Sequence, residues 1–145
     1  PFFLSEPQLH CSLSHSQGTV ATLLGDRVCG CDIQVLVDKM PRIAPKFMRP
    51  DEQEWVSQYP APVQLEYMHL FWTAKEAMYK AHGLKELDFR GHLFIDPFKW
   101  DKESVIQTTG CIQKDDLQLH YRLFMGYFEN EDTSFVWTLA QQSSE

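Results

Sequence analysis

The fold is decided by residues 65–83, LEYMHLFWTAKEAMYKAHG, which carry the main helical pattern of the chain. Apolar side chains recur there at intervals of three, four and seven residues, which is typical of a helix that packs one face on a sheet. We expect this helix to run from about Leu65 to His82, with Gly83 as its left-handed cap. Its opposite stripe is polar and consists of Glu66, His69, Thr73, Glu76 and Lys80.

Short apolar segments on both sides of this helix predict β-strands. Residues 19–24 and 28–33 are separated by the turn-rich residues 25–27, which is typical of a hairpin. After the helix, strands are expected near residues 105–113, 118–128 and 134–140, the last two joined by a polar turn. The pattern predicts an α+β fold with an antiparallel sheet packed on one long helix.

The segment between the second strand and the main helix is rich in proline. Pro41, Pro45 and Pro50 restrict residues 38–50 to short helical turns. Acidic residues from Asp51 onward favour the start of a second short helix, which we expect to end near Tyr59, before a Pro-Ala-Pro stop.

Composition indicates one soluble, globular domain. The chain has 145 residues, of which 43% are hydrophobic, so a single core is expected over residues 1–140 and a disordered tail over residues 141–145. A net charge of −7 argues against nucleic acid as a partner. The sequence shows neither an apolar run of membrane-spanning length nor the pattern of a signal peptide, which predicts a cytoplasmic protein and no membrane partner.

The four cysteines are few for this length. Cys29 and Cys31 fall on one face of a predicted strand, and no second pair stands at metal-ligand spacing. We interpret all four as reduced thiols that behave as small hydrophobic residues, in preference to a metal or redox site.

Two acids suit a magnesium site. Mg²⁺ prefers oxygen ligands and is usually held by one or two carboxylates together with phosphates and waters. Asp32 ends an apolar strand and Glu76 stands on the polar stripe of the helix. Taken singly, Asp32 could simply cap a loop, and Glu76 could form an ordinary surface pair with Lys80 four residues later.

The chain carries three motifs in order: Ser14-His15, Gly30-x-Asp32-Ile33 and Trp72-x-x-Lys75-Glu76-x-x-x-Lys80. This order resembles the 4'-phosphopantetheinyl transferases, most closely the surfactin-synthetase-activating type, and the resemblance covers about residues 1–83. It implies the half-fold of that family over the predicted sheet and helix.

The resemblance also implies a metal and its ligands. Asp32 and Glu76 would bind Mg²⁺, which also holds the pyrophosphate of coenzyme A. The surfactin type usually has a second carboxylate two residues after the aspartate, and here that position is Gln34. Its amide oxygen can still ligate Mg²⁺ or hold a water, although it brings no charge, so Gln34 is the third expected ligand.

Further residues are implied to bind coenzyme A. Lys75 and Lys80 would contact its phosphates, and Ser14 and His15 match the Ser-His pair that contacts the coenzyme. The implied reaction transfers 4'-phosphopantetheine to a serine of an acyl or peptidyl carrier protein and releases 3',5'-ADP. We assign the base to Glu76, and charge neutralisation to Mg²⁺ held with Asp32 and to Lys80 or Lys75.

A carrier protein is typically acidic and needs a local basic patch on this acidic chain. Lys39, Arg42, Lys46 and Arg49 offer one, with Phe47 and Met48 expected to be exposed beside it. An ordinary solvated face is the alternative interpretation.

The length raises a separate question. Surfactin-type enzymes have two similar halves with the active site between them, whereas His15 here follows only fourteen residues. We therefore expect the chain to form a homodimer or to pair with a missing N-terminal half. A non-catalytic module that binds coenzyme A or a carrier protein is the alternative function, and an interaction domain with accidental motif matches is a third.

Overall fold

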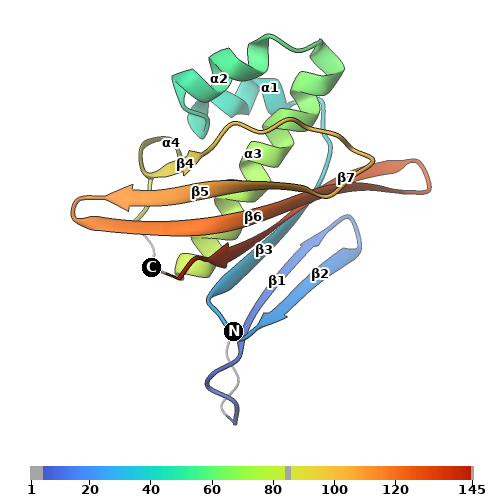
Figure 1. The fold of residues 1–145 in the computed structure, drawn as a ribbon. Coiled ribbons are helices and arrows are strands. Elements are labelled where there is room, and N and C mark those ends of the chain that lie inside the picture. Colours follow the sequence, from blue (N-terminus) through green and yellow to red (C-terminus); the bar gives the residue numbers. More distant parts are fainter. Residues whose placement is uncertain (1–4, 84–85, 145) are drawn as a thin grey trace.

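The computed structural model describes residues 5–83 and 86–144 and shows an α+β fold (Figure 1). Its main sheet has five antiparallel strands in the order β3-β7-β6-β5-β4, and a separate two-stranded sheet is formed by β1 and β2. One long helix, α3, packs on the main sheet, mainly against β3 and β7. This confirms the predicted antiparallel sheet on one long helix.

The bounds of the elements follow the chain in order. The strands are β1 (His10–Ser16), β2 (Thr19–Gly25), β3 (Cys29–Val35), β4 (Leu93–Ile95), β5 (Ile106–Lys114), β6 (Leu117–Asn130) and β7 (Thr133–Gln142). The helices are α1 (Met40–Ile43), the 3-10 helix η1 (Ala44–Lys46), α2 (Pro50–Ser57), α3 (Ala61–His82) and α4 (Phe89–His92).

The predicted hairpin between residues 19–24 and 28–33 is wrong. β2 pairs instead with β1, and β3 pairs with β7 at the edge of the main sheet. The turn between β1 and β2 consists of Gln17 and Gly18, both with positive φ, which is the two-residue geometry that matches strand twist. Most of β3 is buried, so it belongs in the sheet that the helix covers.

Helix α3 begins four residues earlier than expected, because Pro62 lies in its first turn, where proline is tolerated. Its C-terminal end is as predicted, since Gly83 caps it with φ of 73°. The polar stripe is not wholly solvated, because His69 and Thr73 are fully buried. Thr73 bonds Thr138 of β7 across 2.8 Å, so α3 is held to the sheet by polar as well as apolar contacts.

His69 is buried as a neutral imidazole. Its Nε2 accepts a hydrogen bond from the Val37 amide across 2.9 Å, which leaves Nδ1 to donate to the Leu65 carbonyl across 2.7 Å. Burial lowers the pKa of His69, in keeping with these two roles. The ring therefore fixes the segment that leaves β3 against the middle of α3.

Gly30 is the point where α3 crosses β3 most closely. A Cβ atom at this position would overlap the carbonyl oxygen of Ala77 and lie 2.7 Å from the amide nitrogen of Ala81. Only glycine allows this approach, which brings the C-terminal half of α3 against the strand that carries Asp32.

The end of the chain departs from expectation. Residues 141 and 142 belong to β7 and are not a disordered tail. The Gln142 amide donates to the Val28 carbonyl across 2.9 Å, and the Ser143 amide donates to the His120 carbonyl across 2.8 Å. Glu145 lies outside the described residues.

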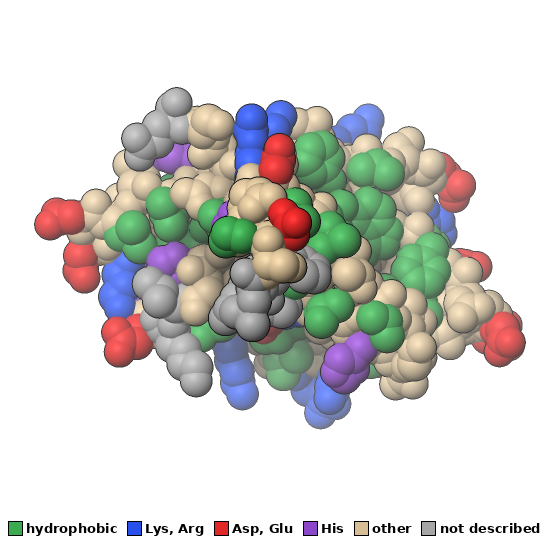
Figure 2. Space-filling view, turned by 90° about the horizontal axis from the view of Figure 1, so that it is seen from below, with side chains coloured by type: hydrophobic (Ala, Val, Ile, Leu, Met, Phe, Trp, Pro, Cys, Tyr) green, Lys and Arg blue, Asp and Glu red, His purple; other side chains and the backbone are tan. Residues whose placement is uncertain are grey.

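The surface carries unpartnered apolar residues on the β1–β2 hairpin. Leu13, Val20 and Leu24 are each more than half exposed, at 53%, 67% and 59%. Viewed from below, apolar side chains are spread over this face of the molecule and are most extensive on the right (Figure 2). Among residues 5–83 and 86–144, no helix combines the length and the apolar composition that crossing a membrane requires.

Candidate functional site

Asp32 lies on β3 with its carboxylate buried between the hairpin and α3. Its side chain is only 4% exposed. Oδ1 accepts hydrogen bonds from the Ser14 hydroxyl and the Lys80 ammonium, both at 2.9 Å. Oδ2 accepts a longer bond, 3.2 Å, from the Gln34 amide nitrogen. A carboxylate this buried needs such partners to remain charged.

Lys80 connects three elements through its ammonium group. Besides Asp32, Nζ donates to the carbonyl of Cys31 on β3 and to that of Leu13 on β1, at 3.1 and 3.3 Å. Its side chain remains 30% exposed. Lys80 therefore holds Asp32 in place and still presents positive charge to solvent.

Glu76 stands one turn before Lys80 on α3. Burial raises the pKa of Glu76, the nearby negative charge of Asp32 raises it further, and Lys80 lowers it. The structure thus brings Asp32 and Glu76 close enough to repel each other. A cation between them would relieve that repulsion.

The residues present fit a magnesium ion. Asp32 and Glu76 supply two carboxylates, and the Gln34 amide oxygen remains available because its nitrogen is the atom that bonds Asp32. No group of three His, Cys, Asp or Glu side chains forms a metal cluster in the part of the chain that the structure describes. Substrate oxygens and waters would have to complete the shell, as is usual for Mg²⁺.

An aromatic groove of about 590 Å³ opens beside Glu76. Its walls come from three segments and consist of Ile43, Lys46, Phe47, Trp72, Tyr79 and Phe89. The rings pack edge to face or tilted, with Trp72 at 5.0 Å from Phe47 and 5.5 Å from Phe89. The groove is therefore a preformed apolar surface next to a charged group.

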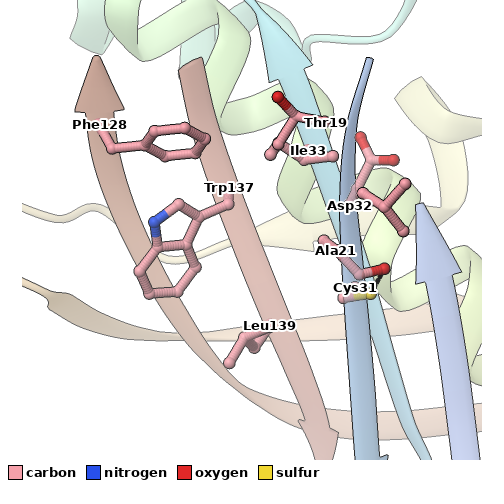
Figure 3. A pocket seen from close by; sticks show the side chains of 9 residues that line it. Thr19, Ala21, Cys31, Asp32, Ile33, Phe128, Trp137 and Leu139 are labelled. Carbon is pink, nitrogen blue, oxygen red and sulfur yellow. Dashed lines mark hydrogen bonds between the residues drawn. The ribbon is translucent and has the colours of Figure 1, made fainter. Parts of the chain in front are cut away.

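A second groove of about 320 Å³ adjoins Asp32 on the outer side of the main sheet. Figure 3 shows Trp137 and Leu139 of β7 and Phe128 of β6 on one side, facing Thr19 and Ala21 of β2. The lining is almost wholly apolar and lies open to solvent between the sheet and the hairpin.

The expectation that Lys75 contacts a phosphate does not fit this structure. Its side chain is fully buried and points away from solvent. Nζ lies 2.8 Å from Glu52 Oε2 and donates to the carbonyls of Phe47 and Phe89, at 2.8 and 3.1 Å. Three acceptors use all three of its protons, so Lys75 ties together the segments that wall the aromatic groove.

Glu52 is the ion-pair partner of Lys75, and the sequence analysis did not predict it. It stands in the first turn of α2, where its Oε2 also accepts from the Arg49 amide across 2.9 Å. A glutamate three residues into a helix commonly makes this bond, and that pattern was the available signal. Burial raises the pKa of Glu52 and lowers that of Lys75, so for both groups burial outweighs their mutual attraction.

The predicted Ser-His pair is divided between two faces of β1. Successive side chains of a strand point to opposite faces, so Ser14 is buried toward Asp32 and His15 is exposed on the other face. The structure thus brings Ser14, Gln34 and Lys80 onto Asp32, with Glu76 one turn before Lys80 on α3. It leaves Lys75 and His15 apart from them.

The predicted docking segment is only partly as expected. Lys39, Arg42 and Lys46 are exposed, whereas Phe47 and Met48 are buried, at 3% and 0%, because they fill the space between η1 and α3. Arg49 is paired with Asp51 at 3.2 Å and lies over the Phe94 ring. The apolar part of this surface is therefore the aromatic groove, in which Phe47 is one wall residue. Neither Phe47 nor Met48 is an exposed side chain.

Comparison with known proteins adds an independent finding. Residues 28–140 match the family model of the 4'-phosphopantetheinyl transferase superfamily. The 4'-phosphopantetheinyl transferase psf-1 of Bacillus pumilus is 34% identical over 77 residues, which cover 53% of this chain. The matched part spans 33% of that relative's length.

Proposed function

Because the chain belongs to the 4'-phosphopantetheinyl transferase superfamily, we propose that it transfers 4'-phosphopantetheine from coenzyme A to a serine of an apo acyl or peptidyl carrier protein. The observation that carries this proposal is the ion pair between Lys80 and Asp32, 2.9 Å apart, with Glu76 one turn before Lys80 on α3. Two carboxylates and a partly exposed lysine on neighbouring elements suit a metal-bound pyrophosphate.

In the proposed reaction, the serine hydroxyl oxygen of the carrier attacks the phosphorus that bears the pantetheine arm. A new oxygen–phosphorus bond forms, the bridging bond of the pyrophosphate breaks, and 3',5'-ADP leaves. Bound Mg²⁺ would neutralise charge on the pyrophosphate. Glu76 takes the serine proton, directly or through a water. Lys80 already bonds Asp32 and the Cys31 and Leu13 carbonyls, but its side chain is 30% exposed, so its positive charge stabilises the charge that develops on the phosphate oxygens.

The aromatic groove gives the pantetheine arm a place beside Glu76. The arm is an extended chain of amides and methylenes, and the groove offers apolar walls with Lys46 at its rim. Lys39, Arg42 and Lys46 extend the exposed basic surface from this rim, which suits an acidic carrier protein.

The experiment that tests the function is incubation with coenzyme A, Mg²⁺ and a panel of apo carrier proteins, read by intact mass. We expect a phosphopantetheine adduct on at least one carrier, and a rate reduced roughly 100-fold or more in Asp32→Asn. Lys99→Gln, at an exposed position far along the chain, is the control. A folded chain that binds coenzyme A but modifies no carrier would favour the non-catalytic module, for which Gln34 in place of a carboxylate is the supporting feature.

We further propose that the chain works in association, as a homodimer or with an N-terminal half. Val20 lines the outer groove beside Asp32, and Leu13 and Leu24 are exposed on the same hairpin; exposed apolar surface of this kind mediates contacts. Sedimentation velocity should show association that Val20→Thr weakens and that Val105→Thr, on the exposed loop before β5, leaves unchanged. A stable monomer that loads a carrier at an ordinary enzymatic rate would contradict this.

A further inference from the structure

Three serine hydroxyls attach the hairpin to the edge of the main sheet. Ser12, Ser14 and Ser16 alternate along β1, and their Oγ atoms accept hydrogen bonds from backbone amides that β3 turns outward. The pairs are Ser12 with Cys31, Ser14 with Ile33 and Ser16 with Val35, at 2.9, 3.1 and 3.1 Å. We call this arrangement the serine ladder. It replaces the backbone pairing that a neighbouring strand would normally supply.

Ser14 differs from the other two members of the ladder. Its hydroxyl accepts from the Ile33 amide and also donates to Asp32 Oδ1 across 2.9 Å. A hydroxyl has one proton, so this proton is committed to the carboxylate. The side chain is 7% exposed. Contact with a phosphate would require Ser14 to give up one of these bonds.

The bonds to Asp32 distinguish its two oxygens. Oδ1 receives both Ser14 and Lys80, which occupy its two lone pairs. Among the described residues, Oδ2 receives only the longer bond from Gln34. The χ2 torsion of an aspartate is otherwise broadly distributed, so these hydrogen bonds determine that Oδ2 is the oxygen with a lone pair left for another partner.

We propose that Ser14 is a positioning residue that orients Asp32 toward a divalent cation, and not a ligand of the coenzyme. This inference rests on the proposed function in that Asp32 holds the cation. Groups that orient a metal ligand by hydrogen bonding commonly change metal affinity 10–100-fold when they are lost.

Mn²⁺ binding to the full 145-residue chain, measured by electron paramagnetic resonance, tests this role without any turnover. We expect Ser14→Ala to raise the Mn²⁺ dissociation constant about 10-fold or more. Ser12→Ala removes the same kind of ladder bond without touching a carboxylate, and we expect it to stay within about 2-fold of the unaltered chain. Equal values for the two variants would overturn the proposal.

Ser14→Thr and Ser14→Val give a second comparison if the alanine variant does not fold. The two side chains share a shape that suits a strand and differ only in the hydroxyl. Threonine should retain Mn²⁺ affinity and valine should lose it, and equal affinities would overturn the proposal.

A metal-free measurement separates positioning from direct phosphate contact. Binding of 3',5'-ADP in the presence of a chelator should be unchanged in Ser14→Ala, and a clear weakening would assign Ser14 to the phosphate instead. If the unaltered chain and its Asp32→Asn variant both fail to bind Mn²⁺, the metal site of the proposed function falls and this inference falls with it. Binding by the unaltered chain with no effect of Ser14→Ala overturns this inference alone.

Discussion

Replacing Gly30 with alanine is expected to lower the free energy of unfolding by about 3 kcal/mol, the upper end of the usual range for overpacking. The added Cβ would overlap the Ala77 carbonyl and crowd the Ala81 amide. Both obstacles are backbone atoms of α3, so no side-chain rotation relieves them. The helix as a whole must move away from β3.

The effect should reach the site, because Glu76 and Lys80 immediately precede Ala77 and Ala81, the two residues of α3 that contact Gly30. Moving the helix would lengthen the 2.9 Å contact between Lys80 and Asp32. Urea unfolding gives the stability, and Mn²⁺ binding reports on the site. The backbone of Gly30 does not have a positive φ, so alanine is strained there by space alone.

Gly25→Ala is the matched control. A Cβ at Gly25 would meet its nearest neighbour, the Arg27 carbonyl, at 3.6 Å, which is an ordinary contact. We expect a change within about 0.5 kcal/mol, or a small gain from the stiffer unfolded chain. If Gly30→Ala were as mild as Gly25→Ala, the close crossing of α3 over β3 would be wrong.

Replacing Lys75 with methionine is expected to lower the free energy of unfolding by about 3–5 kcal/mol. The change would leave the Glu52 carboxylate buried at 5% exposure without its cation, and such removal of one partner is strongly destabilising. It would also leave the Phe47 and Phe89 carbonyls without their donor. Lys46→Met, at an exposed position, should change stability by less than about 0.5 kcal/mol.

A double variant, Lys75→Met with Glu52→Gln, distinguishes a buried charge from lost packing. Neutralising the glutamate removes the unpaired charge, so part of the lost stability should return. A Lys75→Met variant that unfolds like the unaltered chain but binds 3',5'-ADP poorly would restore this lysine to phosphate binding, as the motif alone implies.

The sequence predicted the parts of the fold whose signals are local. The apolar periodicity of residues 65–82, the glycine cap and the strands after the helix each depend on neighbours a few residues apart. By contrast, β1 was missed because its serines lack the apolar alternation of a strand and because they pair through side chains. The partner of β3 was mistaken because nothing local shows that β7, more than 100 residues later, covers its edge.

The candidate site was predicted in part, from the family resemblance and not from local patterns. Asp32, Glu76 and Lys80 were expected in one site because the family resemblance implied it; helix spacing alone puts only Glu76 and Lys80 on one face. The expectation for Lys75 was wrong because the next residue, Glu76, borders the aromatic groove, whereas Lys75 is buried. Its ammonium donates to Glu52, which lies 23 residues earlier in the sequence. Burial of Phe47 and Met48 likewise depends on how η1 folds over α3, which the proline-rich sequence does not specify.

The serine ladder also bears on how the protein avoids joining with other chains. β3 ends the main sheet, and an uncovered edge strand offers a row of amides on which a foreign strand can grow into an aggregate. Hydroxyls from the hairpin occupy three of those amides without extending the sheet. Detachment of the hairpin would therefore expose a template for intermolecular β-pairing directly beside the residues proposed to act on coenzyme A.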